Sequence, residues 1–208
     1  MSVAEFYNKF PSIVVETQDG IHDLEATDFE RLCQAWAMET FPSAKVTRGP
    51  TNKGDQGVDI EVEVGGMTPM HIVIQAKCWD PKGPNVSIKV INETAGAAVA
   101  KNAGYGIVIT SGGFTKEAKA QANRLTNEGK VMMTLLDGNT IWESLMQLPE
   151  YKRRLQEQQK HLSSPLVPTS LQSEIGELYG RTQQVFTNHN SFCFGSKIEQ
   201  KITFFARV

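Results

Sequence analysis

Hydrophobic and polar residues alternate in two neighbouring stretches of the chain, Val58–Val64 (VDIEVEV) and Met70–Lys77 (MHIVIQAK). Both stretches are rich in β-branched residues, and a turn region with two glycines separates them, so the pattern predicts an antiparallel β-hairpin. Only one register buries all the apolar side chains on one face, because a shift by one residue would turn them to the other. In that register the apolar residues form three opposed pairs, which are Ile60 and Ile74, Val62 and Ile72, and Val64 and Met70.

The polar face of this hairpin brings three functional side chains to one end. The same register sets Asp59 opposite Gln75, and Lys77 follows two residues further along the face. Directly opposed Cβ atoms are roughly 4.5–5.5 Å apart, so Asp59 and Gln75 could share one hard cation such as Mg²⁺. The Lys77 ammonium could then orient a water or stabilise charge during phosphodiester hydrolysis. The alternative interpretation is the ordinary solvated face of an amphipathic hairpin.

Helical and strand patterns alternate around the hairpin. Apolar residues recur at helical spacing from Phe29 to Trp36, and a short strand is expected around 44–47. Further along, the pattern predicts a helix over 88–102, a buried strand over 105–110, a helix over 115–127 capped by Thr115, a strand over 131–136 and a helix from Thr140. The sequence therefore predicts an α/β fold, with the antiparallel hairpin and parallel crossovers in one mixed sheet flanked by helices.

Two glycine-rich loops lie next to these elements. The loop at 48–57 (RGPTNKGDQG) lets the backbone turn sharply just before Asp59 and would permit close approach of a ligand. The loop Ser111-Gly112-Gly113 precedes a helix, where backbone N–H groups could meet a phosphate. A plain strand-to-helix connection is the alternative for the second loop.

Composition sets the domain organisation and the compartment. With 208 residues and 40% hydrophobic content, the chain can bury a sizeable core and is most simply one domain with extensions. We expect an N-terminal lead over 1–22, the main domain over 23–149, and a C-terminal helix, linker and tail over 150–208. Three widely spaced cysteines argue against a disulfide framework, and no apolar run is long enough to span a bilayer, so we expect a cytoplasmic protein without a membrane partner.

The net charge does not by itself indicate nucleic-acid binding. The formal value is −2 at pH 7, whereas nucleic-acid-binding domains more often have a basic balance. A local basic stripe near the hairpin remains open, made of Lys53, Lys82, Lys89, Lys101, Lys116, Lys119 and Arg124, and ordinary solvated lysines are the alternative.

A series of motifs extends the argument beyond the hairpin. In chain order these are DFE at 28–30, GDQGVDI at 54–60, IQAK at 74–77, YGIVITSGGFTKEAKAQA at 105–122 and MTLLDGNTIWESL at 133–145. Together they resemble the Mrr-type restriction endonuclease domain of the PD-(D/E)XK nuclease superfamily, over about residues 27–148. The resemblance implies a restriction-endonuclease-like core that hydrolyses double-stranded DNA with Mg²⁺, or with Mn²⁺ as a substitute.

The resemblance also assigns roles to individual residues. Asp59 matches the metal-binding aspartate, Gln75 a position that holds Asp or Glu in most of the superfamily and commonly Gln in the Mrr branch, and Lys77 the catalytic lysine. Glu30 matches an additional acidic residue, so Asp59, Gln75 and Glu30 form the expected metal-binding set. The neutral Gln75 removes one negative charge from this set, which Glu30 would have to supply. Alternatively, Glu30 belongs to a capping box in which Thr27 caps the helix.

Three functions remain open at this point. The first is a metal-dependent DNA endonuclease, with restriction of foreign or modified DNA implied by the resemblance alone. The second is a DNA-binding or assembly module that keeps the nuclease fold without cutting, and the third is a DNA repair or junction-resolving nuclease. The region after residue 150 could support a homodimer or target recognition, and no chemistry is visible there.

Overall fold

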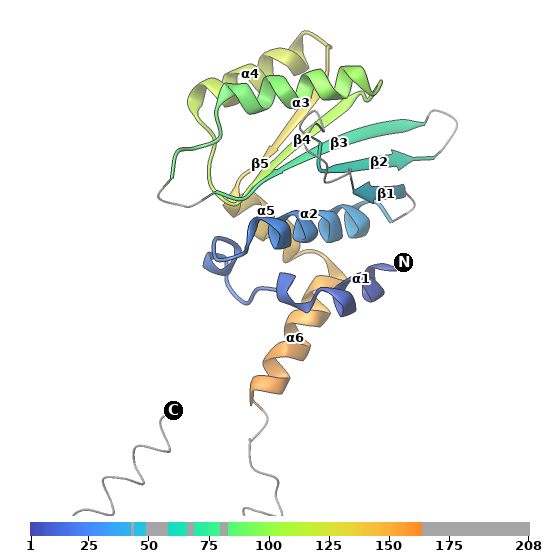
Figure 1. Cartoon of the computed structure of the whole chain (residues 1–208), viewed down its shortest axis with the longest axis vertical. Helices are drawn as coiled ribbons and strands as arrows, with labels where there is room; N and C mark the ends of the chain where they lie inside the picture. The colour runs from blue at the N-terminus through green and yellow to red at the C-terminus, as the bar shows by residue number, and fades with distance from the viewer. Residues whose placement is uncertain (43, 49–57, 66–68, 80–82, 164–208) are drawn as a thin grey trace, which may run out of the picture. The chain divides into compact units, whose positions relative to one another are not determined.

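A five-stranded mixed β-sheet forms the centre of residues 1–162, and its strands follow one another in chain order from β1 to β5 (Figure 1). The strands are β1 (Ala44–Arg48), β2 (Ile60–Val64), β3 (Met70–Lys77), β4 (Tyr105–Thr110) and β5 (Met132–Leu136). Strands β1, β2 and β3 pair antiparallel, whereas β3, β4 and β5 pair parallel. This computed structural model confirms the predicted α/β fold with its mixed sheet.

The structure describes residues 1–42, 44–48, 58–65, 69–79 and 83–163. The expected loop before Asp59 therefore lies outside the described residues, as do the linker and tail after 163. Chain contacts divide the molecule into one unit over Met1–Leu162 and another over Ser163–Val208. Within the described ranges no helix has both the length and the apolar character needed to cross a bilayer.

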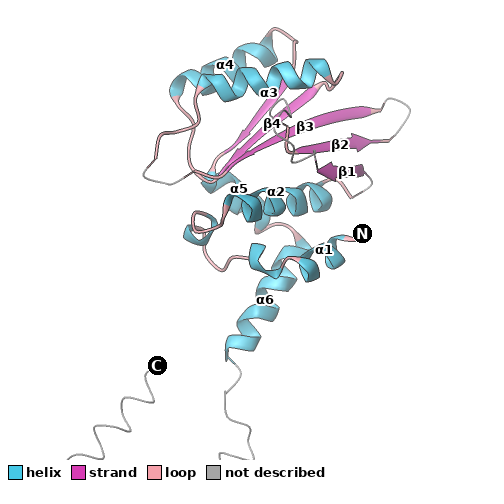
Figure 2. Cartoon of the chain, viewed as in Figure 1, coloured by secondary structure: helices cyan, strands magenta, loops and turns pink. Residues whose placement is uncertain are grey.

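Helices cover both faces of the sheet (Figure 2). On one face, α2 (Ala26–Thr40) and α5 (Gly138–Leu145) contribute to the largest apolar core, together with the apolar side of the hairpin. On the other face, α3 (Ile88–Ala100) and α4 (Lys116–Asn127) close two smaller clusters over β3, β4 and β5. The central strand β4 is buried on both faces, as its continuous apolar sequence predicts.

The predicted hairpin register is confirmed from Ile60 to Val64. Ile60 and Ile74 are opposed and fully buried, because this register turns them, with Val62 and Ile72, into the core that α2 covers. The alternation ends at Asp59, where the chain bends. Val58 therefore packs against Val73 in the core beneath α3, on the face opposite Ile60.

Helix starts differ from the prediction at two of three positions. Thr115 caps α4 as expected, because its hydroxyl accepts the N–H of Ala118. The prediction of Thr27 as a cap is wrong, since α2 begins at Ala26 with Glu25 at its N-cap position. The helix predicted from Thr140 begins earlier, because Asp137 caps α5 through the N–H of Thr140.

The N-terminal lead is partly helical, as expected, and packs on α2 from the side away from the sheet (Figure 1). It contains α1 (Val3–Lys9) and two short 3-10 helices, Pro11–Ile13 and Asp19–Ile21. The charged helix expected after Pro149 is α6 (Pro149–Ser163). Its buried Tyr151 hydroxyl accepts the N–H of Val15 at 3.2 Å and donates to the Val15 carbonyl at 3.1 Å.

Candidate active site

Asp59 occupies the bend that ends the regular β2–β3 ladder. Its N–H donates to the carbonyl of Ile74 at 3.0 Å, and its carboxylate Oδ2 accepts the N–H of Ala76 at 2.8 Å. The carboxylate thus takes the place of a backbone carbonyl beside β3. This arrangement fixes the Asp59 side chain at the end of the hairpin, because it satisfies a main-chain donor that a regular strand would otherwise satisfy.

Gln75 contacts Asp59 directly. Its Nε2 donates to Asp59 Oδ2 at 2.5 Å and lies 3.4 Å from the carbonyl of Ala76. Only 3% of the Gln75 surface is exposed. A solvated-face interpretation is therefore wrong for Gln75, because it is a buried polar side chain whose amide is held by the Asp59 carboxylate.

Lys77 is the last residue of β3 and is half-buried. The alternation of the strand puts it on the face of Gln75. Its carbonyl accepts the N–H of Ser111 at 3.2 Å and the Thr110 hydroxyl at 2.9 Å. The Ser111 hydroxyl in turn accepts the N–H of Trp79 at 2.8 Å and donates to the Trp79 carbonyl at 3.0 Å. The end of the strand that carries Lys77 is thus fixed on both sides of Cys78.

Glu30 precedes Cys33 by three residues on α2, so the two residues lie on neighbouring turns of the helix. The neighbouring Cys33 thiol is fully buried, and burial raises its pKa well above the usual value, with further contributions from the charges of Asp59, Cys78 and Glu30. The negative charges of Asp59 and Glu30 thus both contribute to the raised pKa of the Cys33 thiol. The capping-box alternative for Glu30 is wrong, because Thr27 lies inside the first turn of α2.

The donor set at this site is small. In the part of the chain that the structure describes, no group of three or more His, Cys, Asp or Glu side chains could hold a metal ion. The oxygen donors that the structure brings together at the hairpin end are the Asp59 carboxylate and the Gln75 amide, and the role of Glu30 beside them stays a prediction. This set suits a hard cation that keeps waters and completes its shell with substrate, which is the usual behaviour of Mg²⁺.

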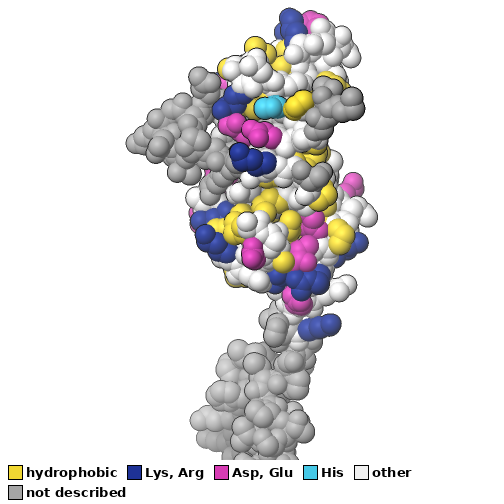
Figure 3. Space-filling view, turned by 90° about the vertical axis from the view of Figure 1, so that its right-hand side faces the viewer, with side chains coloured by type: hydrophobic (Ala, Val, Ile, Leu, Met, Phe, Trp, Pro, Cys, Tyr) yellow, Lys and Arg dark blue, Asp and Glu magenta, His cyan; other side chains and the backbone are white. Residues whose placement is uncertain are grey.

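Charges of both signs share the surface near the hairpin. On the face shown in Figure 3, Lys and Arg side chains of the described residues are interspersed with Asp and Glu. On the hairpin itself, Glu61 pairs with Lys101 at 2.7 Å, and Glu63 lies 4.0 Å from Lys45. Any binding of a polyanion such as DNA would therefore use a few individual basic side chains rather than a broad basic surface, in agreement with the net charge of −2.

Sequence reasoning missed two contributions to the site. One is the main-chain N–H of Ala76, which no side-chain pattern reveals. The other is Ser111, which is fully buried and ties the end of β3 to the loop after β4. The position of Ser111 in the sequence, directly after the buried strand β4 that pairs with the end of β3, could have indicated this role.

Comparisons with known proteins identify the class. The chain matches the restriction endonuclease family model of the Mrr catalytic type over residues 21–145, which is more than half of its length. No curated protein matches the chain. Among solved structures, the FokI restriction endonuclease matches with 14% identity and a TM-score of 0.45, covering 66% of this chain and 29% of that one. FokI bound to DNA matches with 13% identity and a TM-score of 0.45, covering 72% of this chain and 32% of that one.

The mixed sheet, the hairpin and the Asp59–Gln75 contact define an α/β protein with a polar site at the end of its central hairpin. The chain belongs to the restriction endonuclease family, in its Mrr-type branch. This confirms the predicted family. The chain spans less than a third of the length of the FokI chains that it matches.

Proposed function

We propose that this protein is a metal-dependent endonuclease that hydrolyses phosphodiester bonds of double-stranded DNA. The observation that carries the proposal is the hydrogen bond from Gln75 Nε2 to Asp59 Oδ2, with Lys77 two residues further along β3. A buried amide on a carboxylate, followed by an ammonium, is the residue set that the family resemblance implies for cleavage. Restriction of foreign or modified DNA is the expected role.

Asp59, Gln75 and Glu30 are the residues that would hold the cation, with Mg²⁺ expected and Mn²⁺ as a substitute. Gln75 now donates its Nε2 to Asp59, so ligation by Gln75 requires its amide to turn and present Oε1. Glu30 supplies the negative charge that a neutral Gln75 lacks. The bound cation would polarise a phosphoryl oxygen and lower the pKa of a bound water.

The protein's own groups prepare the reaction by position and charge. In hydrolysis the water oxygen bonds to phosphorus while the bond from phosphorus to the leaving sugar oxygen breaks, and that oxygen takes a proton. The Lys77 ammonium orients the water or stabilises the negative charge that develops on the phosphoryl oxygens. Ser111 holds the main chain of Lys77 and Trp79, so it is a positioning residue.

The proposal includes the setting in which the enzyme works. A homodimer would cut both strands with two copies of one site, and it remains a prediction. A cytoplasmic location suits the free thiols of Cys33 and Cys78.

Cleavage of plasmid DNA with and without Mg²⁺ tests this function. Asp59→Ala and Lys77→Ala should each lower the cleavage rate by about a hundredfold or more, while Lys45→Ala, which removes an exposed charge on β1, should cleave like the wild type. Glu30→Gln should raise the Mg²⁺ concentration needed for half-maximal cleavage. Cleavage that survives both Asp59→Ala and Lys77→Ala would refute the site.

A non-cleaving DNA-binding module is the second candidate. Two observations favour it, namely the neutral Gln75 and the lack of a three-residue acidic or histidine cluster among the described residues. This candidate predicts DNA binding without Mg²⁺-dependent nicking. A repair or junction-resolving nuclease would instead cut branched DNA faster than linear duplex, so a panel of methylated, unmethylated and branched DNA separates these functions.

A further inference from the structure

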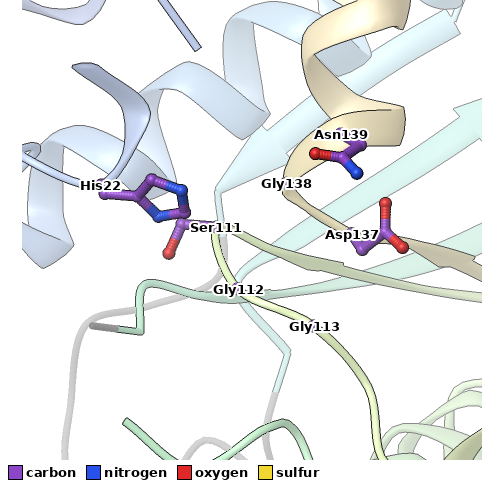
Figure 4. Close-up of a pocket in the computed structure, with 7 residues that line it drawn as sticks. All are labelled: His22, Ser111, Gly112, Gly113, Asp137, Gly138 and Asn139. Atoms are coloured by element: carbon purple, nitrogen blue, oxygen red, sulfur yellow. The ribbon is translucent and has the colours of Figure 1, made fainter. Parts of the chain in front are cut away.

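A pocket of about 240 Å³ lies at the carboxyl ends of β4 and β5 (Figure 4). Its walls are formed by His22, the loop Ser111–Gly113 and the start of α5 from Asp137 to Asn139. Figure 4 shows His22 and Ser111 on one side, Asp137 and Asn139 on the other, and the two loop glycines between them. The carboxyl edge of parallel strands is a usual place for ligands in α/β proteins.

The pocket adjoins the strand that carries Lys77. Lys77 is paired with Thr110, and its carbonyl accepts the N–H of Ser111, the first residue of the pocket loop. Neighbouring strands are about 4.8 Å apart, so the β5 side of the pocket lies roughly 10 Å across the sheet from the β3 end.

Two hydrogen-bonding groups of the pocket have no partner among the described residues. One is His22 Nδ1, which is buried. The other is the N–H of Gly113. The neighbouring donors are occupied, because Gly112 N–H donates to the Thr110 hydroxyl at 3.2 Å and Gly138 N–H donates to the Gly112 carbonyl at 3.0 Å. A buried polar atom such as His22 Nδ1 normally has a partner, and a ligand in the pocket would supply one.

We propose that this pocket binds a backbone phosphate of the DNA strand, beside the phosphate that is cleaved. The Gly113 N–H and a His22 ring N–H donate to the oxygens of this phosphate. The inference rests on the proposed function, because a phosphate held in the pocket would fix the DNA relative to Lys77. Lys119 adds a positive charge, since its charge contributes to the lowered pKa of Asp137. The pocket is too small for a drug-sized ligand, and a single phosphate group fits its volume.

Asp137 does not turn the pocket into a cation site. Its Oδ1 accepts the N–H of Thr140 at 3.0 Å and the Thr140 hydroxyl at 2.7 Å, so it is committed to capping α5. The Asn139 Oδ1 accepts from Gln18 Nε2. Asp137 Oδ1 and Asn139 Oδ1 are thus engaged within the protein, whereas two groups with N–H donors are left for an anion.

Binding of a short DNA duplex by the full chain in EDTA tests the proposal, because no cleavage occurs there. On titration with the duplex, the amide NMR signal of Gly113 should shift, while that of Gly104, which lies in open space, should not. Inorganic phosphate should shift the same Gly113 signal at higher concentration. His22→Ala should weaken duplex binding about three- to tenfold, as expected for the loss of one hydrogen bond.

Charge variants give an independent readout of the same site. Lys119→Gln should reduce the slope of log K against log salt by about 0.9, the value for one phosphate contact. Lys130→Gln, which removes a lysine paired with Glu128 beyond the other end of α4, should leave the slope unchanged. A Gly113 signal that stays in place, with wild-type binding by His22→Ala, overturns the pocket even if the protein cuts DNA. Binding at the pocket without any Mg²⁺-dependent cleavage supports the pocket and overturns the proposed nuclease.

Discussion

At the residue scale, the site depends on one short hydrogen bond between two polar side chains. Gln75 Nε2 and Asp59 Oδ2 are 2.5 Å apart, and Gln75 is 3% exposed. A carboxylate in place of the amide would set two negative charges in contact in a poorly solvated position. The neutral Gln75 amide avoids this repulsion in the metal-free hairpin and leaves one negative charge fewer for the cation.

Gln75→Glu should therefore destabilise the metal-free protein and make it more dependent on Mg²⁺. We expect a loss of about 1–3 kcal/mol in the free energy of unfolding in EDTA at pH 7, with a larger stabilisation by Mg²⁺ than in the wild type. Urea unfolding of both proteins in EDTA and in Mg²⁺ measures this. Gln121→Glu is the matched control, because Gln121 is also buried and donates to Asn92 far from the site; it should lose stability without rescue by Mg²⁺. Equal Mg²⁺ responses of the two variants would contradict the proposed metal site.

At the element scale, α6 is fixed to the N-terminal lead by buried tyrosines. Tyr151 from α6 and Tyr7 from α1 meet edge to face, with ring centroids 6.2 Å apart. Tyr151 bonds both main-chain groups of Val15, whereas the buried Tyr7 hydroxyl has no hydrogen-bond partner among the described residues. Burial raises the pKa of Tyr151 to about 12 and also raises that of Tyr7, which the charge of Glu39 raises further.

Tyr151→Phe and Tyr7→Phe form a matched pair of substitutions. Tyr151→Phe should cost about 1–2 kcal/mol in the free energy of unfolding, because it leaves the part-buried N–H and carbonyl of Val15 without their partner. Tyr7→Phe should cost less or stabilise, since its hydroxyl is already without a partner. Chemical denaturation of the two variants measures the difference, and a larger loss for Tyr7→Phe would contradict this account of the α1–α6 contact.

Glu39 makes the same contact sensitive to pH. Its Oε1 accepts the N–H of Glu150 at 2.6 Å, and burial is the main cause that raises its pKa above 4.5. The folded state therefore binds the proton more tightly than the unfolded chain, so this group's contribution to stability falls as pH rises from 4.5 through the raised value.

Comparison of wild-type protein with Glu39→Gln across this pH range tests the effect. Glu39→Gln keeps an acceptor for Glu150 and should gain stability relative to the wild type as pH rises. Glu5→Gln is a control of opposite sign, because the backbone N–H of Ser2 holds the pKa of Glu5 below 4.5. It should lose stability relative to the wild type as pH rises, and parallel pH profiles for the two variants would disprove the role of Glu39.

The sequence predicted correctly those helices and strands that have a periodic pattern of apolar residues. The register of β2 and β3 followed from one apolar face, and the Thr115 cap followed from local hydrogen-bonding chemistry. The bend at Asp59 escaped prediction, because alternation alone continues through Val58. The burial of Gln75 and the meeting of His22 with the loop at Ser111 depend on tertiary packing, which no local pattern encodes.

At the scale of the whole molecule, the described residues form a sheet with helices on both faces, and two polar regions lie along one edge. The first is the hairpin end with Asp59 and Gln75, and the second is the pocket after β4 and β5. Lys77 and Ser111 connect them through the main chain. Because basic and acidic groups are mixed on the surface, DNA binding should depend on a few local contacts rather than on net charge.

The rate of DNA cleavage in Mg²⁺ by wild-type protein and by Lys77→Ala, with duplex binding measured in parallel, tests the central claim most directly. The account predicts that wild-type protein cleaves in Mg²⁺ and not in EDTA. It also predicts that Lys77→Ala loses cleavage by about a hundredfold or more while its affinity for DNA stays within a few-fold of wild type. Wild-type protein that binds DNA without cutting it in Mg²⁺, or Lys77→Ala that cuts at the wild-type rate, would contradict it.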